Sequence, residues 1–261
     1  MISHADPSQV AGLSRFFKTG PGQYGEGDKF LGIKVPVTRS VVKECWHSVG
    51  LSDLEECISS EYHEVRLASL LALVEIFNHT SKQSKRRHGS QSQSALMAEE
   101  ITQEDCVRFY LDHTEHINNW DLVDLSCYSL LGEWLLDKDR ALLYNLASSG
   151  NTIWEQRIGI VSTMTFIRHG QLDDTFAISD ILLHHPHDLI HKAVGWLLRE
   201  AGKKDKLALE EYLLGADPNM QKQTGGNRHC CRYKGMPRTM LRYAIEKFPE
   251  EERQAYLSGK K

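Results

Sequence analysis

Apolar residues recur with a helical period along most of the chain. In the segment EVRLASLLALVEIF (64–77) they fall at positions 65, 67, 70, 71, 73, 74, 76 and 77, which gives a helix with a wide buried face. Similar patterns predict helices over 121–136, 153–170, 188–202 and 238–248. The sequence shows no alternating apolar segment next to a hairpin turn. We therefore predict an all-α fold.

Residues that favour helix ends support several of these helices. Ser52 is followed three residues later by Glu55, the spacing of a capping box. Asp121 is expected at a helix N-terminus, where a carboxylate meets the positive end of the helix dipole. Gly170 is expected to end the helix predicted over 153–170, and Pro186 stands just before the helix predicted over 188–202.

The predicted helices also recur in pairs. Single polar residues stand in buried-helix segments at Arg66, Asp124, Arg157 and Lys192, and the last two steps between them are 33 and 35 residues. A helix-pair unit of about 35–40 residues is typical of HEAT-type repeats, which stack into a solenoid with a concave binding face. We predict a right-handed α-α solenoid of HEAT-like helix pairs, forming one domain over residues 1–261. A helical bundle can produce the same spacing.

Two polar segments interrupt the repeat pattern. The segment SKQSKRRHGSQSQSA (81–95) is rich in Ser, Gln, Lys and Arg, and it lengthens the first step to 58 residues. The segment GADPNMQKQTGGNRHCCRYKG (215–235) delays the final helix in the same way. Because segments with so few apolar residues bury too little surface to order themselves, both inserts are expected to be disordered.

The charge of the chain is unevenly distributed. Its 261 residues carry a net charge of −4, yet residues 192–261 hold 15 Lys and Arg against 9 Asp and Glu. A basic C-terminal portion fits a polyanionic partner such as nucleic acid. A solvated basic surface explains the same charge equally well, so charge alone leaves the partner open.

Other features bear on where the protein acts. No apolar run approaches the roughly 20 residues that cross a bilayer, so no membrane span is expected. The first residues lack the basic-then-apolar pattern of a signal peptide. The six cysteines are scattered, which indicates reduced thiols in an intracellular protein, cytoplasmic or, in a eukaryote, nuclear. A monomer is the default expectation.

Two short motifs suggest a ligand but lack the residues that would bind it. The segment GPGQYGEGD (20–28) is glycine-rich, yet it lacks the Gly-Lys-Ser/Thr of a phosphate-binding P-loop, and no strand precedes it. His229, Cys230 and Cys231 are adjacent, so they do not easily converge on one metal, and no second CxxC pair exists. We therefore expect no nucleotide cofactor and no metal.

Five segments, in order along the chain, carry a resemblance to a known family. They are FFKTGPGQYGEGDKFLGIKVP (16–36), NNWDLVD (118–124), IWEQR (153–157), KAVGWLLRE (192–200) and MPRTMLRYAIEKFPEEERQAYL (236–257). Together they resemble the DNA alkylation repair enzymes of the AlkD type, which are HEAT-like-repeat alkylpurine DNA glycosylases. The resemblance runs from about residue 13 to the end, interrupted by the two polar inserts.

The resemblance implies a specific chemistry. The family removes bases such as 3-methyladenine and 7-methylguanine, whose positive charge weakens the bond to deoxyribose. The enzyme must then stabilise a cation-like sugar and direct water to it, and a carboxylate does both. The family's carboxylate matches Asp124, its two tryptophans match Trp120 and Trp196, and the arginine beside the carboxylate matches Arg157. Trp120 and Asp124 stand four residues apart, so they are expected to share one helix face.

The resemblance also implies the partner, which is double-stranded DNA containing alkylated bases. The family is expected to act without flipping the base into a pocket, unlike most glycosylases. Tyr24 is expected to face the DNA cleft, although the loop around it makes the match loose. Lys192, Arg199, Arg238 and Arg242 are expected to contact phosphates. An exposed helix face would explain each of these four basic residues equally well.

Structural explanations stand beside these roles. Asp124 and Arg157 can form a structural ion pair within the fold, and Trp120 and Trp196 can be ordinary core aromatics. A non-catalytic relative that binds branched or distorted DNA is the main alternative function, although it needs no carboxylate directed at a sugar. A protein–protein scaffold is a third, and it predicts an apolar or acidic concave face.

Overall fold

The computed structural model describes residues 1–87, 101–218 and 231–261. In these ranges every regular element is a helix, and pairing of extended backbone is limited to two isolated bridges. The all-α prediction is confirmed. The chain divides into two compact units, Met1–Leu130 and Leu131–Lys261. None of the described helices is long and apolar enough to cross a membrane.

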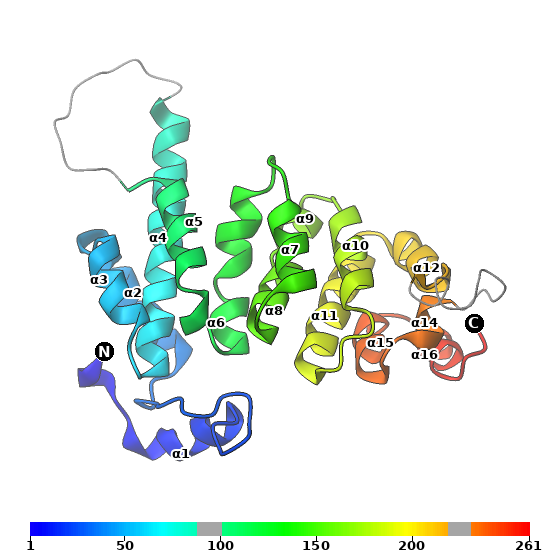
Figure 1. Cartoon of the computed structure of the whole chain (residues 1–261), viewed down its shortest axis with the longest axis horizontal. Coiled ribbons are helices and arrows are strands. Elements are labelled where there is room, and N and C mark those ends of the chain that lie inside the picture. The colour runs from blue at the N-terminus through cyan, green and yellow to red at the C-terminus, as the bar shows by residue number, and fades with distance from the viewer. Residues whose placement is uncertain (88–100, 219–230) are drawn as a thin grey trace. The chain divides into compact units, whose positions relative to one another are not determined.

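The first unit is centred on the long helix α4. Its elements are η1 (Ile2–His4), α1 (Pro7–Phe16), α2 (Val35–Cys45), η2 (Trp46–Ser48), α3 (Leu51–Ile58), α4 (His63–Arg87), α5 (Gln103–Asp112), η3 (Thr114–His116) and α6 (Trp120–Asp124). Leu67, Leu70, Leu73 and Phe77 of α4 are buried, and α2, α3 and α5 pack against this helix (Figure 1). A helix covered on several sides needs a wide apolar face, which is the pattern read from the sequence.

The second unit is centred on α11. A π-helical turn, η4 (Tyr128–Gly132), crosses the boundary between the units, and the unit continues with α7 (Ala141–Ser149), α8 (Ile153–Val161), α9 (Met164–Arg168), α10 (Asp173–Leu182), α11 (Asp188–Lys204), α12 (Lys206–Leu214), α14 (Arg232–Gly235), α15 (Arg238–Ala244) and α16 (Glu250–Leu257). Ile190, Val194 and Leu197 of α11 are fully buried, and α8, α10, α12 and α15 pack against it. Consecutive helices therefore pack side by side, as expected for a helical repeat protein.

Two of the predicted helices are interrupted. The segment predicted as one helix over 121–136 contains α6, a turn and η4, and the segment over 153–170 is split into α8 and α9. At both breaks a serine hydroxyl donates to the carbonyl four residues earlier, Ser126 at 2.5 Å and Ser162 at 2.7 Å. Such side-chain bonds compete with the helix ladder and bend the helix. Gly170, at φ 77°, follows α9 and ends this pair as predicted.

Helix α3 begins differently from the prediction. Its first residue is Leu51 and its N-cap is Gly50, so the acidic residue at the third position is Asp53. The Gly50 N–H donates to Asp53 Oδ2 at 2.8 Å. The predicted capping box of Ser52 and Glu55 is therefore wrong, because the helix starts before Ser52 rather than after it.

The two polar inserts fall largely outside the described residues. At the start of the first insert, residues 81–87 continue α4, and near the end of the second, Arg232 begins α14. The expectation of disorder is wrong for these ends. The Arg232 Nε lies 2.7 Å from Asp180 Oδ1, and the guanidinium stacks 4.6 Å from the ring centre of Tyr212. An ion pair and an aromatic contact therefore order a segment whose composition is polar.

Candidate active site

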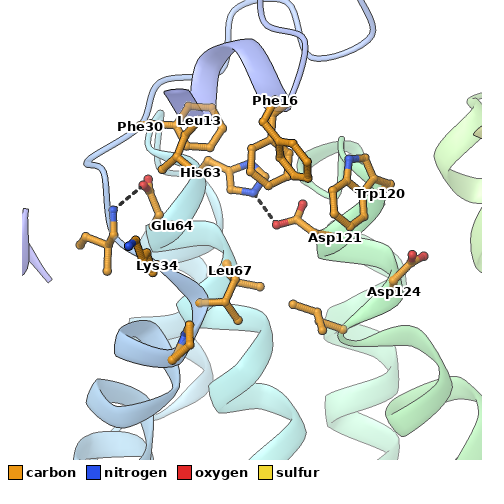
Figure 2. A pocket seen from close by; sticks show the side chains of 15 residues that line it. Leu13, Phe16, Phe30, Lys34, His63, Glu64, Leu67, Trp120, Asp121 and Asp124 are labelled. Carbon is orange, nitrogen blue, oxygen red and sulfur yellow. Dashed lines mark hydrogen bonds and ion pairs between the residues drawn. The ribbon is translucent and has the colours of Figure 1, made fainter. Parts of the chain in front are cut away.

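A cavity of about 420 Å³ lies within the first unit, between α1, α2, α4 and α6 (Figure 2). Most of its walls are apolar, and polar groups enter at a few points, which is typical of ligand sites. Two of the predicted catalytic residues, Trp120 and Asp124, contribute to the walls. The lining residues are Leu13, Phe16, Phe17, Phe30, Ile33, Lys34, Val35, Pro36, His63, Glu64, Leu67, Trp120, Asp121, Asp124 and Leu125.

Helix α6 brings Trp120 and Asp124 to this cavity. Asn119 caps the helix, and its Oδ1 accepts a hydrogen bond from the Trp120 backbone N–H at 2.9 Å. Trp120 and Asp124 are both half-buried and stand one helical turn apart. In Figure 2 the Asp124 carboxylate points away from Leu67, toward the edge of the cavity. The prediction that the two residues share a helix is confirmed, and the carboxylate is not sealed in the interior.

Aromatic rings form one side of the cavity. The Trp120 ring stacks on Phe17, with ring centres 5.4 Å apart and planes 20° apart, and Phe17 stacks in turn on Phe30 at 5.2 Å. Phe16 meets Trp120 edge-on at 5.8 Å. Stacked and edge-on contacts between rings stabilise a fixed arrangement beyond the burial of their surface. The indole of Trp120 is therefore held in place by the end of α1.

His63 lies buried between two carboxylates. Its Nδ1 is 3.0 Å from Asp28 Oδ2 and its Nε2 is 2.9 Å from Asp121 Oδ2, and none of the three side chains is more than 5% exposed. Burial alone would lower the pKa of His63, but hydrogen bonds to Asp121 and Asp28 and their charges raise it from 6.5 to about 9. The ring is then an imidazolium that donates to both carboxylates.

The neighbouring residues of α4 hold the loop on the other side of the cavity. The Glu64 carboxylate accepts hydrogen bonds from the backbone N–H groups of residues 31–33, at 2.9, 2.9 and 3.0 Å. Arg66 Nη2 donates to Asp28 Oδ1 at 2.6 Å. Burial would raise the pKa of Asp28, yet the hydrogen bond from His63 and the charge of Arg66 hold it low. The first turn of α4 therefore fixes both this loop and, through His63, the start of α6.

Sequence reasoning missed most of this network. It placed Asp121 at a helix N-terminus, where it lies, but it did not assign any role to His63, Glu64 or Asp28. The available signal was a group of three charged or titratable residues, His63, Glu64 and Arg66, at the start of the helix that was predicted to have a wide buried face. Buried polar side chains of this kind require partners, so they point to a network even when the partners are unknown.

Arg157 and Trp196 belong to the second unit. Arg157 on α8 is 5% exposed, and its Nη1 donates to the carbonyl of Leu189 at 2.6 Å. The guanidinium thereby joins α8 to the first turn of α11. Trp196 is half-buried on α11, and the adjacent Gly195 packs so closely on α15 that a Cβ would not fit. That these two residues act together with Asp124 stays a prediction.

Two of the predicted phosphate contacts are already paired with acidic side chains. Lys192 Nζ lies 2.7 Å from Asp188 Oδ2, one turn earlier on α11. Arg199 forms ion pairs with Glu200 and with Glu246. Both cations are therefore paired within the fold, which favours the solvated-surface interpretation for these two residues.

The other predicted DNA contacts are more open. Arg238 is exposed and donates to the carbonyl of Leu257, which leaves its charge unneutralised by that contact. Arg242 is exposed, and among the described residues no acidic side chain pairs with it. Tyr24 is half-buried in the first unit and is not one of the residues that line the cavity. That Arg238 and Arg242 contact phosphates stays a prediction.

No described group of three His, Cys, Asp or Glu side chains is arranged to bind a metal. His229 and Cys230, two of the three adjacent residues considered from the sequence, lie outside the described residues. The structure therefore offers no ligand set for a metal in the parts of the chain that it describes.

Comparisons with known proteins address the family. A family model described as DNA alkylation repair enzyme matches residues 1–248. The chain belongs to this family. Among solved structures, one described as a predicted DNA alkylation repair enzyme from Enterococcus faecalis is similar, with a TM-score of 0.62 and 16% identity over 95% of this chain and 98% of that chain. At this identity the likeness concerns the fold. No curated protein sequence matches the chain.

Membership in the DNA alkylation repair enzyme family confirms the resemblance read from the five sequence segments. It places the chain in the repair of alkylation damage, with DNA as its substrate. The family description does not extend to the bond that is broken, to the adducts, or to the roles of Asp124, Trp120, Trp196 and Arg157.

Proposed function

We propose that this DNA alkylation repair enzyme is a glycosylase that hydrolyses the N-glycosidic bond of positively charged alkylpurines in duplex DNA, such as 3-methyladenine and 7-methylguanine. One observation carries the proposal. In a chain of the alkylation repair family, Asp124 is a half-buried carboxylate at the edge of an apolar cavity, one helical turn from a tryptophan. A charge in such a position acts on a cationic reaction centre more strongly than a charge in water.

The proposed role of Asp124 is electrostatic. Alkylation gives the base a formal positive charge, so the base leaves as a neutral molecule without being protonated. As the bond breaks, positive charge moves to the deoxyribose ring, and the carboxylate stabilises it there. The same carboxylate accepts a hydrogen bond from a water molecule and directs its oxygen to C1′, and the released proton passes to the carboxylate and then to solvent.

Trp120 is proposed to assist at the same place. Its ring is held by Phe17 and Phe16 and remains half-exposed beside Asp124. An indole face attracts a neighbouring cation by roughly 0.5–2 kcal/mol. The family resemblance implies the same role for Trp196. Because Arg157 is buried and bonded to a backbone carbonyl, its position favours support of α11 over direct contact with DNA.

The proposed reaction does not require the base to enter a pocket. An uncharged base must be activated by contacts with the enzyme, whereas a cationic alkylpurine is already a good leaving group. We therefore propose that the enzyme acts on the sugar and leaves the base outside a binding pocket, in contrast to base-flipping glycosylases. Duplex DNA is the proposed substrate, with no metal and no cofactor in the reaction.

The test is release of free bases from methylated duplex DNA. The DNA is incubated with the protein, and free 3-methyladenine and 7-methylguanine are measured by chromatography and mass spectrometry. Release above the spontaneous loss in a protein-free sample is expected, with abasic sites left in the DNA. Asp112→Asn, which alters an exposed carboxylate at the end of α5, should release bases as the wild type does. Tight binding without release would refute the proposal and favour a non-catalytic protein that binds distorted DNA.

A further inference from the structure

Phe16 is an aromatic side chain left in solvent at the end of α1. It is 60% exposed, and no other phenylalanine or tryptophan in the described parts of the chain is exposed to this degree. It stands at the rim of the cavity, beside Trp120 (Figure 2). The exposed ring is continuous with the apolar lining of this cavity, and a contiguous apolar surface of this kind is suited to contact with another molecule.

The ring of Phe16 is held on a rigid support. It packs edge-on against Phe17 at 5.1 Å and against Trp120 at 5.8 Å. Phe17 is buried and stacks between Phe30 and Trp120. The next residue, Lys18, turns the chain with φ 57°, and its carbonyl accepts a backbone hydrogen bond at 3.0 Å from the loop that follows. Little ordering entropy is therefore lost when the ring meets a ligand.

Two cationic residues stand close to Phe16 in the sequence. Arg15 and Lys18 are exposed, and neither forms an ion pair with a side chain in residues 1–87, 101–218 or 231–261. An exposed aromatic ring with unpaired cations close to it in the sequence fits a ligand that combines a flat surface with negative charges. A nucleobase between the phosphates of its own strand has this form.

We propose that Phe16 stacks on a nucleobase of the duplex at the alkylated site, with Arg15 and Lys18 on the flanking phosphates. Phenylalanine side chains insert between base steps in other DNA-binding proteins. Since Phe16 contacts Trp120, which is one turn from Asp124, the ring enters the duplex beside the sugar on which Asp124 acts. The inference rests on the proposed function in taking damaged DNA as the ligand. It makes Phe16 the residue that distinguishes damaged from intact duplex, because a base step weakened by damage opens at lower cost.

The test compares two duplexes of one sequence at a fixed salt concentration. One contains a single tetrahydrofuran analogue of an abasic site, which a glycosylase cannot cleave, and the other is intact. A 2-aminopurine opposite the analogue reports base stacking by its fluorescence. Wild type is expected to prefer the analogue duplex and to change the fluorescence. Phe16→Ala is expected to lose about tenfold in affinity for the analogue duplex alone, and to lose the fluorescence change, while Phe16→Trp keeps both.

Two further variants separate stacking from packing. Phe16→Leu keeps an apolar contact with Trp120 but has no aromatic face, so it should melt like the wild type and bind like Phe16→Ala. Leu207→Ala removes another exposed apolar side chain, 69% exposed on α12, and should bind both duplexes like the wild type. Should Phe16→Ala fail to fold, Phe16→Leu supplies the same comparison.

Several results would overturn the proposal for Phe16. One is an unchanged affinity of Phe16→Ala for both duplexes, and another is an equal loss of affinity for both. A third is a wild-type preference for the analogue duplex in Phe16→Leu, which would assign the ring to packing. The base-release assay separates this question from the proposed function. If the protein prefers the analogue duplex through Phe16 but releases no base, the glycosylase proposal is refuted and the role of Phe16 stands. If it releases bases without such a preference, the role of Phe16 is refuted and the glycosylase proposal stands.

Discussion

Replacing His63 by glutamine should remove stability in a manner that depends on pH. The imidazolium donates to Asp28 and Asp121 in the folded protein, and these partners raise the pKa of His63 to about 9, against 6.5 in the unfolded chain. A group whose pKa is higher in the folded state stabilises that state most at pH values where the group is protonated in both the folded and the unfolded protein. The contribution is therefore complete below pH 6.5 and is lost as the pH rises through about 9.

The size of the effect follows from the two pKa values of His63. A difference between 6.5 and about 9, at about 1.36 kcal/mol for each pH unit, corresponds to about 3 kcal/mol in the free energy of unfolding. The side chain is 2% exposed, so solvent screening reduces this value little.

Urea unfolding of wild type and His63→Gln, from pH 6 to pH 10, measures this contribution. The difference in unfolding free energy should shrink by about 3 kcal/mol across the range, with most of the change between pH 7 and 9. His187→Gln is the control, because burial lowers the pKa of His187, so its contribution to stability does not decrease as the pH rises from 7 to 9. A His63→Gln difference that stays constant from pH 6 to 10 would show that the ring is not charged between the two carboxylates.

Two further variants test the positions of basic residues in the second unit. Arg157→Ala should lower the free energy of unfolding by about 1–3 kcal/mol, because it removes a buried guanidinium and leaves the half-buried Leu189 carbonyl without this donor; urea unfolding equal to that of the wild type would contradict the structural role. Arg242→Ala should weaken DNA binding and reduce the log–log salt slope by about 0.9, the value for one phosphate contact. Titrations between 50 and 200 mM salt measure the slope, and Arg253→Ala, which removes a cation paired with Glu250, should leave it unchanged.

The regular part of the fold could be predicted from the sequence because it depends on local pattern. The apolar period of α4 follows directly from burial on several sides, and Gly170 ends its helix by adopting φ 77°, which glycine adopts without strain. The breaks after α6 and α8 were missed. Ser126 and Ser162 produce them through hydroxyl bonds to the preceding turn, yet an apolar pattern with a serine in it reads as a continuous helix.

The candidate site could be predicted only where it depends on one helix. Trp120 and Asp124 are four residues apart, so their common helix follows from spacing alone. The bonds of His63 to Asp28 and Asp121 join residues that are 35 and 58 positions apart in the sequence. The apolar period of a helix contains no information about such distant partners.

The charges of the C-terminal region could also be predicted only in part from the sequence. The sequence shows an excess of basic residues there, but not which of them are neutralised. Lys206 pairs with Glu252 and Arg232 pairs with Asp180, across 46 and 52 residues. Only the folded chain separates these paired cations from exposed ones such as Arg242.

Asp124 is proposed to act on the transition state and not on binding, and single-turnover kinetics test this most directly. The substrate is a duplex with one 7-methylguanine, with protein in excess, and the variant is Asp124→Asn, which keeps the shape of the side chain and removes its charge. The rate of base release should fall by about 100-fold or more, while the dissociation constant for the duplex stays at its wild-type value. Release by Asp124→Asn at the wild-type rate would contradict the assignment of Asp124 as the catalytic carboxylate.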